Sequence, residues 1–180
     1  MTVMEVLKFP HPTLKQKAKP VTEFNRDLTS LSDAMLETMY KEGGIGLAAI
    51  QVGVLKRLVV TDLGNNTTED EENGPGAGPD TRKPRVFVNP VLLSGEGEVI
   101  TEEGCLSVVE FTAEVRRYQR IKVGYRTLKG EKQQEVFEDL EAICLQHEMD
   151  HLDGKLFIDH LPPVKRQVIK KRLAKLAKSA

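Results

Sequence analysis

Residues 138–154, EDLEAICLQHEMDHLDG, contain an HExxH motif made of His147, Glu148 and His151. Two histidines four positions apart project from one face of a helix, so both imidazoles can bind a single metal ion. Glu148 would lie beside this metal without binding it. A carboxylate in that position can take a proton from metal-bound water and pass it to a leaving group. The motif therefore predicts a metal site with hydrolytic chemistry.

The residues before the motif continue the same helical face. Leu140, Ile143 and Cys144 follow helical spacing towards the two histidines. Along this face, apolar residues come first and the metal-binding histidines last, which is typical of a helix buried in the centre of a domain. Gly154 is expected to end the helix. The alternative is a solvated helix face with two unrelated histidines. The apolar stripe makes that the weaker interpretation.

Size and composition indicate a single domain and do not point to a particular class of binding partner. The chain has 180 residues, a net charge of −1 and 39% hydrophobic residues, so we expect residues 1–180 to form a single catalytic domain. The balanced charge does not indicate a nucleic-acid or membrane partner. No apolar run reaches signal-peptide or membrane-spanning length, which favours a cytoplasmic protein. In that compartment Cys105 and Cys144 are expected to be ligand or core residues rather than a disulfide.

Two further helices are predicted. One runs from Leu28 to Lys41 with an apolar face, and Asn25 or Asp27 precedes it as a cap. The other, 164–178, is strongly basic, and its apolar face is formed by Val164, Val168, Ile169, Leu173 and Leu176. The ordinary explanation of such a charge run is a solvated face. The more specific one is contact with an anionic partner such as RNA.

The remaining pattern is mainly extended. Residues 3–9 are expected to be extended up to Pro10. Strands are predicted at 58–62, 85–93, 98–107, 111–128 and 132–138, with a turn at Lys129 and Gly130 before the last one. Residues 64–84, rich in acid, glycine and proline, are expected to form a flexible loop insertion between the first two strands.

Small residues replace bulky ones almost completely at 43–53, GGIGLAAIQVG. Such a segment lets the backbone approach a ligand closely, although a flexible glycine turn is the ordinary explanation of GGIG by itself. The segment lacks the lysine of a phosphate-binding loop and the spacing of a dinucleotide-binding motif. Gln51 is its one polar side chain that could donate a hydrogen bond into a site.

The third metal ligand distinguishes two kinds of site. Gly154 occupies the glycine position of the zinc-protease pattern HExxHxxGxxH, but Phe157 stands where that pattern has its third histidine, and His160 comes three residues too late. Cys105, beside Gly104, supplies the missing ligand. Two histidines and one cysteine leave one position for water, which is the arrangement of a catalytic site.

Three segments resemble, in order and spacing, the signature motifs of peptide deformylase: GIGLAAIQVG at 44–53, EGCLSV at 103–108 and QHEMDH at 146–151. The opening VLKFPHPTLKQKAKPV and the basic last helix are also similar. The resemblance implies an α+β fold in which antiparallel sheets pack around a central HExxH helix, with a C-terminal helix. It also implies removal of the formyl group from the N-terminal formylmethionine of nascent chains. For the basic helix we hypothesise contact with the ribosome near the peptide exit.

The resemblance also implies a role for each site residue. Cys105, His147 and His151 would hold a divalent metal, ferrous iron in the family, which zinc, nickel or cobalt could replace in a purified sample. Glu148 would be the general acid and base as metal-bound hydroxide attacks the formyl carbon. Gln51 and the backbone N–H of Leu106 would receive the oxyanion. Gly46 would contact the substrate, and the methionine pocket would be lined by Ile45, Leu140, Ile143 and Cys144.

The chain departs from the family pattern at three positions. Ile50 and Val109 stand where prolines are common, and Thr112 stands where an arginine often contacts the substrate backbone. Ile50 affects only the expected rigidity of its loop, whereas Val109 and Thr112 affect the expected peptide affinity or preference. The metal chemistry is expected to be unchanged. Two other functions stay open on the sequence alone. One is a metallopeptidase or amidohydrolase that acts on another acyl group, and the other is an inactive protein that binds nascent N-termini.

Overall fold

The computed structural model describes residues 2–64 and 82–179. Its three α-helices are α1 (Arg26–Lys41), α2 (Asp139–Leu152) and α3 (Pro163–Ser179). Its strands are β1 (Gly46–Ala48), β2 (Leu58–Asp62), β3 (Pro84–Glu96), β4 (Val99–Cys105), β5 (Val108–Arg117), β6 (Arg120–Arg126) and β7 (Lys132–Glu138). Short 3-10 helices are η1 (Pro12–Lys15), η2 (Ala49–Val52) and η4 (Phe157–His160).

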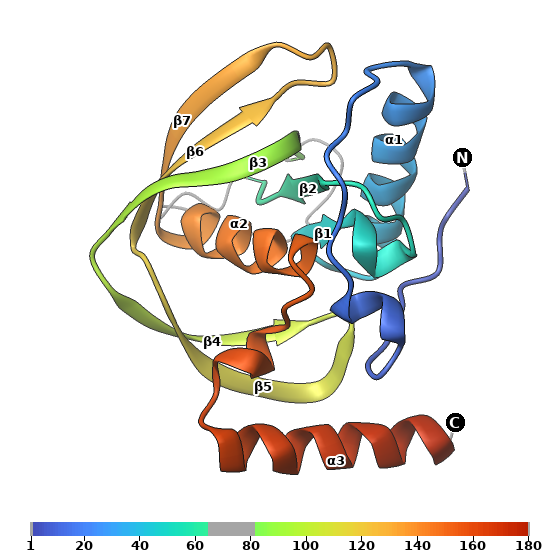
Figure 1. Ribbon diagram of the computed structural model, residues 1–180, viewed down its shortest axis with the longest axis vertical. Helices are drawn as coiled ribbons and strands as arrows, with labels where there is room; N and C mark the ends of the chain where they lie inside the picture. Colours follow the sequence, from blue (N-terminus) through green and yellow to red (C-terminus); the bar gives the residue numbers. More distant parts are fainter. Residues whose placement is uncertain (1, 65–81, 180) are drawn as a thin grey trace.

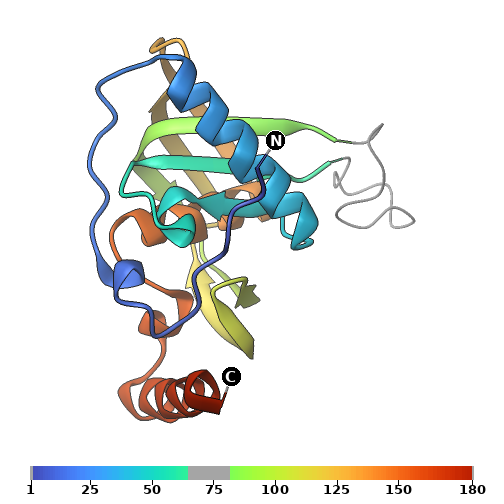
Figure 2. The same ribbon diagram turned by 90° about the vertical axis from the view of Figure 1, so that its right-hand side faces the viewer.

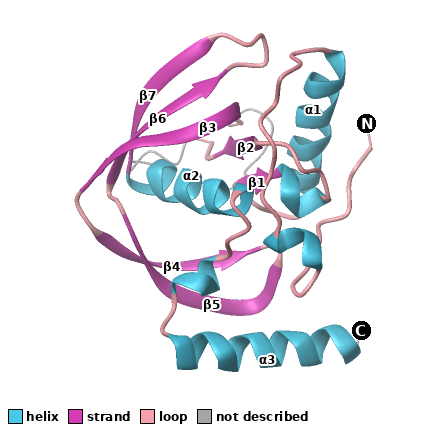
Figure 3. Cartoon of the chain, in the orientation of Figure 1, coloured by secondary structure: helices cyan, strands magenta, loops and turns pink. Residues whose placement is uncertain are grey.

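The strands form two antiparallel sheets around α2. The larger sheet has the order β1-β2-β3-β6-β7, and the smaller one pairs β4 with β5. Helix α2 lies between the two sheets (Figures 1 and 3). This arrangement confirms the predicted α+β class with a central HExxH helix and a C-terminal helix.

Alternating side chains of β2 explain why helices cover both faces of the larger sheet. Val59 packs in the same core cluster as Leu145 of α2. Its neighbours Leu58 and Val60 pack in a second cluster with Met35 of α1. Successive side chains of a strand point to opposite faces, so β2 is buried on both sides. Helix α1 therefore packs on the face of the sheet opposite α2.

The ends of two helices confirm the local sequence signals. The side chain of Asn25 accepts a hydrogen bond from the backbone N–H of Leu28 at 3.1 Å, so Asn25 rather than Asp27 caps α1. Gly154 follows the end of α2 with φ of 75°, a left-handed conformation that glycine adopts without a steric penalty.

The predicted strand 111–128 is wrong as a single element. It is divided between β5 and β6, which belong to different sheets. At the break, Tyr118 donates its backbone N–H to Gln146 Oε1 and accepts from Gln146 Nε2, both at 2.9 Å. This side-chain amide of α2 replaces a neighbouring strand as the hydrogen-bond partner. Most of the expected loop 64–84 lies outside the described residues.

Helix α3 lies beyond β5, away from the larger sheet (Figures 1 and 2). Its buried residues are Ile169 and Leu173, whereas Val164, Val168 and Leu176 are exposed. The predicted apolar face was therefore too wide, because α3 packs against the protein with one side only. None of the helices in the described part of the chain is long and apolar enough to cross a membrane.

Candidate metal centre and peptide pocket

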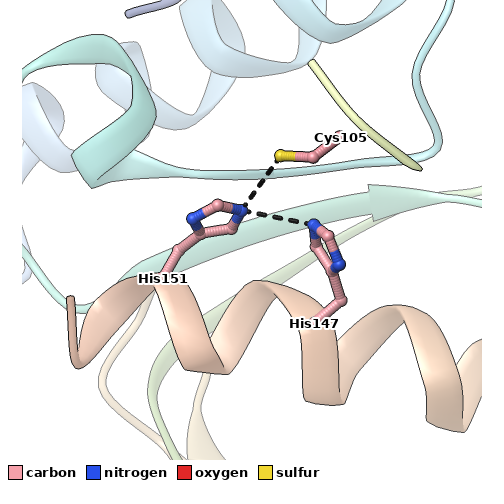
Figure 4. A group of neighbouring side chains, drawn as sticks. All are labelled: Cys105, His147 and His151. Carbon is pink, nitrogen blue, oxygen red and sulfur yellow. Dashed lines mark hydrogen bonds between the residues drawn. The ribbon is translucent and has the colours of Figure 1, made fainter. Parts of the chain in front are cut away.

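Helix α2 and the end of β4 bring three metal-binding side chains together. His147 and His151 point from α2 towards Cys105 (Figure 4). The Nε2 atoms of the two histidines lie 3.2 Å apart, and Cys105 Sγ lies 3.3 Å from His151 Nε2. The edge of a tetrahedron with metal bonds of about 2.1 Å is about 3.4 Å long. These two distances are close to that edge, and all three donor atoms lie within 4.8 Å of one another, so together they could bind one ion.

A buried carboxylate orients the first histidine. Glu103 Oε1 lies 2.8 Å from His147 Nδ1, which leaves Nε2 of that ring for a metal. Arg117 donates to both oxygens of Glu103, at 2.7 and 2.8 Å. Burial alone would raise the pKa of Glu103, but the hydrogen bonds from Arg117 and His147 outweigh it and lower the pKa to about 2. The carboxylate is thus charged and keeps the imidazole in a metal-binding orientation.

The thiol of Cys105 has the chemistry of a ligand. Burial opposes its ionisation, but the charges and hydrogen bonds of the two histidines hold its pKa well below the usual value. A thiolate is the form that binds metal ions. Cys105 and Cys144 are both free. This donor set fits a divalent transition metal with one open coordination position.

Glu148 lies beside the ligands with a free oxygen. The residue is buried, with 5% of its surface exposed. Its Oε2 atom has no hydrogen-bond partner among the described residues. Burial is the largest cause that raises its pKa. A carboxyl group of this kind is suited to accept and return a proton during a reaction.

Gln51 is held with its amide nitrogen towards the ligands. Its Oε1 atom accepts from the backbone N–H of Ala48 at 2.9 Å. Its Nε2 atom donates to Ser107 Oγ at 3.2 Å and lies 3.6 Å from Cys105 Sγ. The amide orientation is therefore set by the protein, and its nitrogen lies on the side of Cys105.

The N-terminal segment connects the two sides of the pocket. The backbone N–H of Leu7 donates to the carbonyl of Gln51 at 2.7 Å, and that of Phe9 donates to the carbonyl of Ser107 at 2.8 Å. Between them, Lys8 Nζ donates to the carbonyl of Leu106 at 2.6 Å. The extended residues predicted at 3–9 are thus not a sheet strand. They hold Gln51 and Leu106 in place relative to each other.

These groups line a cavity of about 470 Å³. Its lining includes every residue expected in the site except His151: Ile45, Gly46, Gln51, Cys105, Leu106, Leu140, Ile143, Cys144, His147 and Glu148. The apolar residues of α2 form one wall, and the small residues at 43–46 form another. The alternative of a solvated HExxH face is wrong, because His147 and His151 are both buried.

His160 does not contribute to the metal cluster. Its Nε2 atom lies 2.8 Å from Asp150 Oδ2, at a second cavity of about 540 Å³ that contains none of the three ligands. Asp150 in turn accepts from Arg117 at 2.7 Å. The structure therefore agrees with the sequence spacing, which already placed His160 three residues too late for the third ligand of the zinc-protease pattern.

Sequence patterns missed the residues that support the ligands. Glu103 precedes Cys105 closely enough to have been considered, since buried histidine ligands need a partner for their second nitrogen. Arg117 and Ser107 carry no comparable local signal. They become recognisable only when the two sheets have brought distant segments together.

Comparison with known proteins gives a consistent result. A family model described as polypeptide deformylase matches residues 3–167. The peptide deformylase of Phenylobacterium zucineum is 48% identical over 100% of both chains. Peptide deformylase 1 of Shewanella oneidensis is 46% identical over 99% of this chain and 98% of its own.

Solved structures agree with these relatives. A peptide deformylase from Legionella pneumophila has a TM-score of 0.83 and 37% identity, covering 98% of this chain and 96% of its own. The plant peptide deformylase PDF1B has a TM-score of 0.86 and 35% identity, covering 99% of this chain and 91% of its own.

Proposed function

Since the chain belongs to the polypeptide deformylase family, a family of hydrolases, we propose that it removes the formyl group from N-terminal formylmethionine of nascent polypeptides. One observation supports this most directly. The buried Oε2 atom of Glu148, which has no hydrogen-bond partner within residues 2–64 and 82–179, shares a cavity with Cys105 and His147. The wall of small residues there suits a group as small as formyl. This substrate places the proposed activity in the cytoplasm.

Cys105, His147 and His151 would hold one divalent metal ion. When bound, it would supply Lewis acidity and lower the pKa of a water molecule at the open position. We propose ferrous iron on the basis of the family. The Irving–Williams order places iron below nickel and zinc for such donors, so a purified sample can carry another ion.

Glu148 is proposed to move the proton. It takes a proton from the attacking water as the oxygen adds to the formyl carbon, and returns it to the methionine nitrogen as the C–N bond breaks. Formate and a free amino terminus result. The raised pKa of the buried carboxyl suits both halves of this transfer, because a strongly acidic group would not hold the proton between them.

Gln51 and Leu106 are proposed to stabilise the developing oxyanion. Gln51 Nε2 and the backbone N–H of Leu106 would donate to the formyl oxygen as it becomes negative. The contacts of residues 7–9 with both segments keep these donors in position before substrate arrives. Donors that need no reorganisation are the ones that lower a barrier most.

The methionine side chain is proposed to occupy the apolar part of the cavity. Leu140, Ile143 and Cys144 come from α2, and Ile45 comes from the facing loop. Gly46 would contact the formyl group or peptide backbone. In this arrangement Cys144 belongs to the pocket wall and not to the ligand set, since among the described residues the cluster within 4.8 Å consists of Cys105, His147 and His151.

Formate release under anaerobic conditions would test the proposed function. Iron-loaded protein should hydrolyse formyl-Met-Ala and leave acetyl-Met-Ala and internal peptide bonds intact. Cleavage of the acetyl or internal bond would favour the broader amidohydrolase. Peptide binding without release of formate, by protein with one equivalent of iron, would favour the binding protein instead.

We also propose that residues 1–180 form a single catalytic domain whose basic helix α3 contacts the ribosome. One core cluster includes Phe87 of the larger sheet, Leu145 of α2 and Ile169 of α3, which supports a single folding unit. Deleting α3 would uncover this core, so charge substitutions are the better test. Changing the exposed Lys171, Arg172 and Lys175 to glutamine should weaken ribosome binding and reduce its salt dependence, while turnover of free peptides is retained. Unchanged binding would leave α3 with a structural role only.

A further inference from the structure

A fixed carboxylate lies on the wall of the peptide pocket outside the reaction chemistry described above. Glu102 of β4 lines the same cavity as Glu148. Its side chain is on the exposed side of the strand, and its Oε1 atom accepts from Thr112 Oγ1 at 2.6 Å. Because threonine is neutral, this hydrogen bond orients the carboxylate without removing its charge.

The surroundings of Glu102 add to its negative charge. Glu114 of β5 is its direct cross-strand partner in the register of the small sheet. In the described part of the chain, neither carboxylate forms an ion pair, whereas Glu103 is neutralised by Arg117. Like charges directly opposite each other on two strands destabilise a sheet. The two carboxylates are therefore expected to repel each other in the free protein.

We propose that Glu102 is a specificity-determining residue, which favours formyl peptides with lysine or arginine in the two positions after formylmethionine and disfavours those with aspartate or glutamate. This inference rests on the proposed function, because it assumes that the peptide leaves the pocket along β4. A cationic side chain there would neutralise Glu102 and reduce its repulsion of Glu114.

The expected preference is moderate, because Glu102 is exposed to solvent. Exposed ion pairs in proteins contribute about 0.2–1 kcal/mol, which is about 1.4-fold to fivefold in an equilibrium. A lysine peptide gains this attraction, and a glutamate peptide meets a repulsion of similar size. The two effects multiply, so the ratio of kcat/KM between the two peptides should be about twofold to 25-fold at low salt. It should decrease at high ionic strength, where exposed charges are screened.

Matched peptides provide the test. We would measure kcat/KM for formyl-Met-Ala-Lys, formyl-Met-Ala-Gln and formyl-Met-Ala-Glu amides, and for the same three residues at the second position. Wild-type protein should prefer lysine over glutamate at one position at least. Glu102→Gln should reduce the ratio towards one, and Glu102→Lys should reverse it. Glu96→Gln removes the same charge from an exposed residue away from the cavity, so it should retain the wild-type ratio.

The outcomes separate this inference from the proposed function. If the neutral glutamine peptide is not deformylated, the proposed function fails. If it is deformylated but the lysine and glutamate peptides have equal kcat/KM, the inference is overturned and the function stands. A ratio that persists in Glu102→Gln would also overturn it, because the preference would then come from other residues.

Discussion

Replacing Gly46 by alanine should test how closely the pocket is packed against α2. A Cβ atom built at this position would lie 2.8 Å from Cys144 Sγ, 2.9 Å from Glu148 Oε1 and 3.0 Å from Glu148 Cγ. Carbon atoms in ordinary contact are about 3.5–4.0 Å apart. Gly46 does not have a positive φ. The substitution is therefore unfavourable for steric reasons, and it would displace the side chain of Glu148, the proposed proton carrier.

The magnitude follows from these contacts. Inserting a methyl group into a packed interior destabilises a protein by about 1–3 kcal/mol. Replacing glycine by alanine offsets about 0.4–1 kcal/mol of this, because alanine lowers the conformational entropy of the unfolded chain. A net loss of about 1–2 kcal/mol should lower Tm by about 2–8 °C for a chain of this size. Displacement of the Glu148 carboxyl should reduce kcat by about 100-fold, because small errors in the position of reacting groups are costly.

The assay combines thermal unfolding with formate release and uses Cys144→Ala as a second background. Removing the sulfur relieves the closest contact but leaves both contacts to Glu148. Gly46→Ala should therefore lower Tm less in the Cys144→Ala background, whereas kcat stays low. Gly104→Ala serves as the stability control, since its Cβ meets nothing closer than 3.4 Å. Wild-type Tm and kcat in Gly46→Ala would refute the reasoning.

Three further predictions concern the metal and its neighbours. Glu148→Gln should lower kcat by about 100-fold to 10,000-fold with unchanged metal content by elemental analysis; a smaller loss would contradict its role in proton transfer. Arg117→Met should weaken metal affinity about 10-fold to 100-fold in a chelator competition, because Glu103 loses the partner that orients it. Wild-type affinity in this variant would show that Glu103 orients His147 without the hydrogen bonds from Arg117. Removal of metal by a chelator should abolish formate release, and added ferrous iron should restore it; full activity of metal-free protein would exclude Cys105 and the histidines from a catalytic metal site.

Local patterns predicted the parts of the site that one element carries. His147, Glu148 and His151 lie within a single helix, so their relative positions follow from helical geometry alone. Cys105 could be added because the chain offers no third histidine at a suitable spacing. Asn25 and Gly154 were recognisable for the same reason, since a cap depends on its neighbours in the chain.

Features that depend on contacts between distant segments were not predictable. The break between β5 and β6 depends on Gln146, which satisfies Tyr118 from another element. The support of His147 needs Arg117 to reach Glu103 across the small sheet. The exposed side of α3 depends on which surface the helix meets. A sequence shows which residues are apolar, but not which of them will find a partner.

The contacts of the N-terminal segment have a consequence for the order of synthesis. Residues 7–9 are made first, yet their partners are Gln51 and Ser107, and Ala18 donates to the carbonyl of Leu152 at the end of α2. Contacts between segments this far apart in the chain form late in folding. A growing copy of this protein would therefore lack the ligands His147 and His151, and the contact of Ala18 with Leu152, until α2 has been translated. On the proposed mechanism, a product that ends before His151 could not release formate, so activity should begin only after α2 has been made.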